Sequence, residues 1–174
     1  TATDPANDDA SAAAAAQEEE LRRALDIKSR ILDAVGVTAD KLPINLEMAT
    51  TPEMLANALA FRPHAACLVP EKREERTTEG GLDVARLHNQ VAPYVQKLRE
   101  AGIRVSLFIE PDKVQVAVAE AMGAPVVELH TGKYVELVFH GDKAGAAEEL
   151  KRLHEAAEHG AAKAEEAESR QPEQ

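Results

Sequence analysis

Four short apolar segments, each followed by a turn and then a helical pattern, constrain the fold of this chain more than any other feature. The expected strands are residues 44–48, 65–69, 104–109 and 126–129. The helical patterns that follow them cover residues 52–61, 84–101, 111–122 and 143–168. Strands and helices that alternate in this way predict βα units with parallel strands and right-handed crossovers. The expected fold class is α/β, and residues 134–140 fit either a further short strand or the beginning of the last helix.

The two ends of the chain differ in composition from its middle. Residues 1–17 are small, polar or acidic, with a run of alanines, so we expect a disordered lead-in or a frayed helix start. Leu21, Leu25, Ile31 and Val35 then recur near helical spacing, which predicts an amphipathic helix. One α/β domain is expected over residues 18–160, followed by a frayed charged tail over residues 161–174, where the apolar face disappears.

Composition argues against several classes of partner. A net charge of −11 and an aromatic content of 3% are unfavourable for binding a nucleic-acid backbone or stacking its bases. No apolar stretch approaches the roughly 20 residues that span a bilayer, and the N-terminus lacks a signal pattern. The single cysteine, Cys67, suits a reducing compartment. We therefore expect a cytoplasmic protein that binds neither nucleic acid nor membrane.

The segment 69–83 joins the second strand to its helix and alternates acidic and basic residues. It has no apolar face to bury, and it contains the pairs Thr77-Thr78 and Gly80-Gly81, which supply hydroxyl donors and backbone freedom. This pattern is typical of an active-site loop, although a solvated connector has a similar composition.

Polar residues alternate with apolar ones along the strands. Glu47 lies in the middle of the first strand and Glu128 in the fourth, each on the face opposite the apolar residues. Mid-strand carboxylates are costly to bury unless they are paired or functional, and sites of α/β proteins form at the carboxyl ends of strands. Glu47 and Glu128 are therefore candidate acid–base groups.

Two further polar residues are open to other interpretations. Glu110 precedes Pro111 and is interpreted as a helix-start residue, since acids favour the first helical turn. His130 follows the fourth strand and is either a satisfied core histidine or part of a site. The histidines are scattered without ligand spacing, so neither a metal nor another cofactor is expected.

Several motifs resemble one enzyme family, in order and with similar spacing. They are Asn45-Leu46-Glu47-Met48-Ala49, Arg62-Pro63-His64, the run from Cys67 to Arg73, the run from Thr77 to Val84, Val105-Ser106-Leu107-Phe108-Ile109, Gly123-Ala124-Pro125, and Glu128-Leu129-His130-Thr131-Gly132. Over residues 43–134 the chain resembles pyridoxine 5'-phosphate synthase.

The resemblance implies a TIM barrel that condenses 3-amino-2-oxopropyl phosphate with 1-deoxy-D-xylulose 5-phosphate, releasing phosphate and water. It also implies that Glu47 is the general base, that Glu128 stabilises charge in the transition state, and that Thr77 contacts the deoxyxylulose phosphate. The loop over residues 69–83 would be the lid that closes over these phosphorylated substrates.

The resemblance covers the third to sixth βα units of an eight-unit barrel, and such barrels typically take about 250 residues. The sequence holds no counterpart of the family's Asn-x-Asp-His, His-x-Arg and Gly-His-Gly segments. We therefore expect about half a barrel with long helical ends, whose open sheet edges are covered by the terminal helices or by another subunit, and we expect self-association. The alternative to an active synthase is an inactive half-barrel that serves as a structural or phosphate-binding module.

Overall fold

The structure is a computed structural model that describes residues 43–75 and 80–169, together with the single positions 15, 19, 22 and 26. The expected lead-in and the helix after it fall almost entirely outside these residues, and Thr77 lies outside them as well.

The described strands form one parallel sheet in which sequence order and spatial order agree. Strands β1 (Asn45–Met48), β2 (Ala65–Leu68), β3 (Arg104–Ile109) and β4 (Val126–Leu129) lie in the order β1-β2-β3-β4. Every neighbouring pair is parallel. This arrangement confirms the α/β class, and it is the arrangement of consecutive βα units in a TIM barrel.

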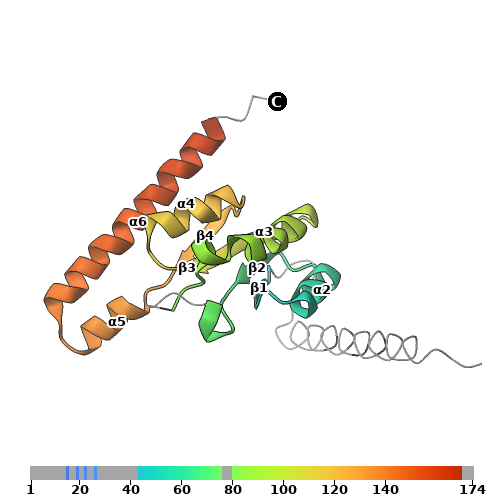
Figure 1. Cartoon of the computed structure of the whole chain (residues 1–174), viewed down its shortest axis with the longest axis horizontal. Helices are drawn as coiled ribbons and strands as arrows, with labels where there is room; N and C mark the ends of the chain where they lie inside the picture. Colours follow the sequence, from blue (N-terminus) through green and yellow to red (C-terminus); the bar gives the residue numbers. More distant parts are fainter. Residues whose placement is uncertain are drawn as a thin grey trace, which may run out of the picture.

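Helices connect and flank these strands. They are α2 (Pro52–Phe61), the short 3-10 helix η1 (Arg73–Glu75), α3 (Val84–Glu100), α4 (Lys113–Ala121), α5 (Gly132–Phe139) and α6 (Lys143–Ser169). Figure 1 shows α6 as a long rod that passes beside α4 and α5. In the described residues, no helix combines the length and the apolar character needed to cross a membrane.

The core lies between one face of the sheet and the helices. Met48, Leu68 and Leu107 point to this face from three strands and are buried, as are Val91 and Val95 of α3. The period of two in the strands and the helical spacing in α3 bring these apolar faces together. The opposite face of the sheet keeps the polar residues.

Side-chain caps mark where helices α2 and α4 begin. Thr51 caps α2 by accepting a hydrogen bond from the backbone N–H of Met54 at 3.2 Å. Asp112 caps α4 by accepting from the backbone N–H groups of Val114 and Gln115 at 2.8 and 3.2 Å. The helix therefore begins at Lys113, and the interpretation of Glu110 as a helix-start residue is wrong.

Helices α5 and α6 differ from the expectations for the C-terminal part of the chain. Residues 134–140 belong mostly to α5, so this segment is helical. Helix α6 continues to Ser169, past residue 161, where we expected fraying. Alanine, glutamate and lysine have high intrinsic helix propensity, which sustains helical geometry even where the apolar face has ended. The domain boundaries at residues 17 and 160 stay predictions.

Candidate active site

The polar face of the sheet carries a row of chemically active side chains. Glu47 of β1 lies beside Cys67 of β2, and Cys67 lies beside Ser106 of β3 in the strand register. Two residues further along β3, Phe108 lies beside Glu128 of β4. Because side chains of a strand alternate between faces, all five project from the face opposite the helices.

A hollow of about 460 Å³ opens on this face. Its volume lies within the range of small-molecule sites, roughly 300–1,000 Å³. Its lining residues come from three of the strands and from the segments that follow them: Glu47, Val69, Pro70, Gly80, Phe108, Glu128 and His130. The two predicted catalytic carboxylates, which are carried by the two outer strands, thus line one hollow.

The two carboxylates have different surroundings. Glu128 is half-buried, and the Ser106 hydroxyl donates a hydrogen bond of 2.6 Å to its Oε1 atom. Glu47 is exposed. In the described part of the chain, the expectation that Glu47 is a buried carboxylate is therefore wrong. The reason is that β1 is an outer strand of the described sheet, and Glu47 is exposed on it.

The thiol between these groups is buried and protonated. Cys67 is fully buried, and this burial raises the pKa of its thiol to about 12, although the Ser106 hydroxyl offsets part of the shift. The negative charge of Glu128 acts in the same direction as burial. Since the thiolate is the nucleophilic form, Cys67 is a packing residue under the polar face rather than a nucleophile.

The loop that precedes α3 reaches the hollow at its C-terminal end. Gly81 donates its backbone N–H to Glu110 Oε1 at 2.9 Å, and Leu82 donates to the backbone oxygen of Phe108 at 2.8 Å. A Cβ atom at Gly81 would lie 2.5 Å from the backbone nitrogen of Glu110, so only glycine permits this approach. Thr77 belongs to residues 76–79, outside the described ones, and its role stays a prediction.

His130 lies at this site and not in the apolar core. Its ring packs edge-to-face against Phe108, with 5.3 Å between ring centroids. Its Nδ1 atom lies 3.3 Å from Oε1 of Glu110, whose side chain is 6% exposed. Strand alternation had placed His130 on the polar face together with Glu128. The role of Glu110, the carboxylate next to His130, was predicted wrongly.

One contact of the site had no signal in the sequence. Arg152 of α6 donates from Nη2 to Glu110 Oε2 at 2.9 Å and from Nε to the backbone oxygen of Pro111 at 3.1 Å. It also donates from Nη1 to Glu149 at 3.3 Å.

Among the described residues, no three His, Cys, Asp or Glu side chains are grouped in a way that could hold a metal ion.

Comparison with known proteins places the chain in a family. The family described as pyridoxal phosphate biosynthesis protein PdxJ matches residues 17–166. The chain belongs to the PdxJ family. Relatives carrying the name pyridoxine 5'-phosphate synthase include one from Rhodospirillum rubrum, 61% identical over 120 residues, which cover 68% of this chain and 46% of the relative.

Two further PdxJ relatives with the same name show similar partial coverage. The one from Zymomonas mobilis subsp. mobilis is 65% identical over 97 residues, covering 56% of this chain and 38% of the relative. The one from Gluconobacter oxydans is 52% identical over 128 residues, covering 74% of this chain and 52% of the relative. The chain thus spans about half the length of the curated relatives it matches.

Proposed function

We propose that this chain carries the acid–base half of a pyridoxine 5'-phosphate synthase site, which condenses 3-amino-2-oxopropyl phosphate with 1-deoxy-D-xylulose 5-phosphate. The observation that carries the proposal is that Glu47 and Glu128, from opposite outer strands, line one hollow of ligand size. Membership of the PdxJ family and relatives named for this activity support the same reaction.

The chemistry suits the two carboxylates. Ring closure removes protons from the condensed substrates and expels water, so it needs a base and a group that stabilises developing positive charge. Glu47, which is exposed to the hollow, is proposed as the base. Glu128, oriented by the Ser106 hydroxyl, is proposed as the stabilising carboxylate. Thr77 in the loop is proposed to contact the phosphate of the deoxyxylulose substrate.

The first test replaces the proposed base. The purified chain is given both phosphorylated substrates, and pyridoxine 5'-phosphate is measured by chromatography with fluorescence detection. Glu47→Gln is expected to lower turnover by about 10²–10⁴, the usual contribution of a general base, while circular dichroism stays unchanged. Turnover retained in Glu47→Gln would remove Glu47 as the base.

A chimera tests the same residues in the context of a full-length relative. The segment of the Rhodospirillum rubrum protein that aligns with this chain is replaced by the sequence of this chain. We expect the chimera to form product and the Glu47→Gln chimera to form almost none. If a folded chimera forms no product while the unaltered relative does, the alternative of an inactive structural or phosphate-binding module is favoured.

The proposal extends to location and partners. We propose a cytoplasmic protein with small phosphorylated substrates and no nucleic-acid partner. The net charge of −11 and the buried Cys67 thiol support these assignments. Self-association is proposed because β1 and β4 are the outer strands of the described sheet.

A further inference from the structure

An unpaired nitrogen beside the hollow carries an inference that rests on the proposed function and extends it. Nδ1 of His130 is buried and has no hydrogen-bond partner among the described residues, although Glu110 Oε1 is only 3.3 Å away. Buried polar atoms are usually paired, and catalytic hydrogen bonds are often loose before the substrate binds. The pair is thus close to a hydrogen bond that a small ring movement completes.

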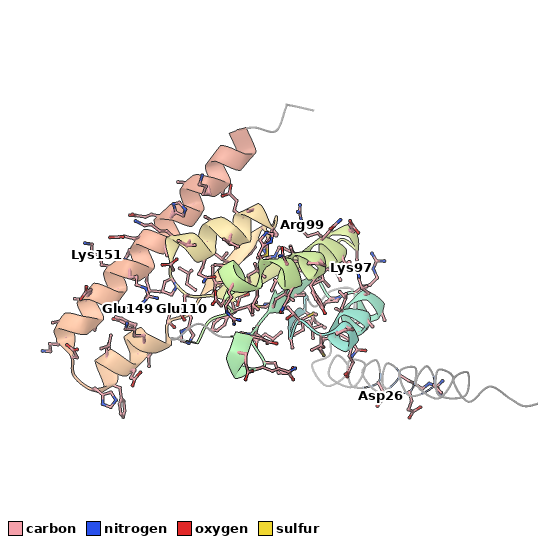
Figure 2. The ribbon with its side chains drawn as sticks, viewed as in Figure 1. Asp26, Lys97, Arg99, Glu110, Glu149 and Lys151 are labelled. Atoms are coloured by element: carbon pink, nitrogen blue, oxygen red, sulfur yellow. The ribbon has the colours of Figure 1, made fainter. Side chains whose placement is uncertain are left out.

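The carboxylate that faces this nitrogen is held from two sides. Oε1 of Glu110 accepts the backbone N–H of Gly81, and Oε2 accepts from Arg152 Nη2, both at 2.9 Å. Arg152 is itself held by Pro111 and Glu149. Figure 2 shows Glu110 and Glu149 close together where α6 passes the sheet. Glu110 is therefore a fixed, charge-compensated acceptor rather than a free carboxylate.

Two glycines, Gly80 and Gly132, lie against the Cε1–Nε2 edge of the imidazole ring. A Cβ atom at Gly132 would lie 2.8 Å from Nε2 of His130, and one at Gly80 would lie 3.4 Å from it. Both neighbours are glycine, so nothing beyond the backbone covers this edge from these two positions. The His130 side chain is 20% exposed and lines the hollow together with Glu47 and Glu128.

We propose that His130 is a third acid–base group of this site and that Glu110, held by Arg152, is its positioning residue. Glu110 binds the tautomer that carries its proton on Nδ1, which leaves Nε2 as a proton acceptor toward the hollow. Nε2 takes a proton from the condensed substrate and returns it to a departing hydroxyl, which leaves as water. The carboxylate stabilises the imidazolium formed between these two transfers.

The tautomer of His130 tests the positioning role without any activity measurement. The full chain is labelled with ¹⁵N-histidine and studied by long-range ¹H–¹⁵N spectra near pH 9, where ordinary imidazoles of pKa about 6.5 are neutral. The spectrum of His130→Gln identifies the signal among the six histidines. We expect the proton on Nδ1 in the native chain, and a proton on Nε2 overturns the proposal.

Glu110→Gln is expected to switch this tautomer. Its single amide oxygen is drawn to the charged Arg152, which turns the NH₂ group toward Nδ1 of His130 and leaves the Gly81 backbone N–H without its acceptor. That nitrogen must then accept a hydrogen bond, and its proton moves to Nε2. Glu155→Gln is the matched control, because Glu155 pairs α6 with Lys113 at an exposed position away from the hollow. An Nδ1 proton that persists in a folded Glu110→Gln variant contradicts the proposal.

Turnover separates this proposal from the proposed function. In the active chain or chimera, Glu110→Gln and His130→Gln are expected to lower kcat by about 10²-fold with little change in KM, while Glu155→Gln leaves both unchanged. Product formation with an unaltered kcat in Glu110→Gln overturns the role of Glu110 but leaves the synthase function standing. If Glu110→Gln does not fold, the native tautomer and His130→Gln still decide the question.

Discussion

The contact between Ser106 and Glu128 joins neighbouring strands on the polar face. The hydroxyl donates at 2.6 Å to a half-buried carboxylate, which limits the directions in which Glu128 points. A serine in mid-strand would otherwise be an ordinary small polar residue. At this position it orients a group that is predicted to act in the reaction, much as Glu110 is proposed to orient His130.

Removing that hydroxyl tests its orienting effect. Ser106→Ala is expected to lower kcat by about tenfold, because the charged hydrogen bond is worth about 1.5–3 kcal/mol and its loss leaves Glu128 free to rotate. KM should change less than kcat. Steady-state kinetics of the active chain or chimera give both values, and a pure rise in KM would show that the contact serves binding instead.

At the scale of elements, the beginning of α3 is tied to α4. Asp83 caps α3 by accepting from the Arg86 backbone N–H at 3.2 Å, and its Oδ1 also accepts from Gln115 Nε2 at 3.0 Å. Gln115 in turn accepts from the Ala85 backbone at 3.1 Å. This exchange holds the two helices together next to the loop that ends at the hollow, so the cap stabilises the geometry of the site as well as the helix.

Asp83 makes stability depend on pH. Partial burial alone would raise the pKa of its carboxyl, but the hydrogen bonds from Gln115 and Arg86 and the charge of Arg86 outweigh burial and hold the pKa below the ordinary value of 3.8. A lowered pKa in the folded state stabilises the fold above the unfolded pKa, and this stabilisation disappears as the pH falls through the folded pKa.

Asp83→Asn is therefore expected to lower the free energy of unfolding by about 1 kcal/mol at pH 7. The difference from the native chain should shrink as the pH falls below about 4. Urea unfolding followed by circular dichroism at several pH values measures both effects. A difference that is constant from neutral to acidic pH would mean that the charge of Asp83 does not stabilise the fold.

At the scale of the whole molecule, the described sheet has β1 and β4 as its outer strands. Outer strands present backbone groups that readily pair with another chain unless something covers them. Helix α6 packs against β4 and α4, whereas Glu47 of β1 is exposed in the part of the chain that the structure describes.

We expect the chain to be a dimer or larger in solution, joined along the β1 side. Sedimentation velocity at micromolar concentration measures the mass, which is 18.7 kDa for one chain. A proline at Asn45 should weaken association, since it removes a backbone donor of β1. The same change at Lys143, the exposed first residue of α6, removes only the N–H donated to the Gly141 oxygen, away from β1, and should leave association unchanged. A monomer at all concentrations would contradict the expectation.

The sequence by itself determined most of the local elements, the class of fold and the family. Period-two alternation placed Glu47, Ser106 and Glu128 on one face, because strand geometry alone dictates that alternation. Helical spacing predicted α2, α3, α4 and α6 to within a few residues, because this signal acts over one or two turns, whereas α5 was left open between strand and helix. The family resemblance named Glu47 and Glu128 as candidates, and their roles stay predictions.

Only the tertiary structure decided what lies behind the site. Arg152 reaches Glu110 from a helix 42 positions further along the chain, and no local pattern predicts a contact at that separation. For the same reason Glu110 was wrongly assigned to a helix start. The requirement for glycine at position 81 also comes from a tertiary contact, the close approach of its backbone to that of Glu110. Such contacts depend on how complete elements pack, and packing is a property of the whole chain rather than of any segment.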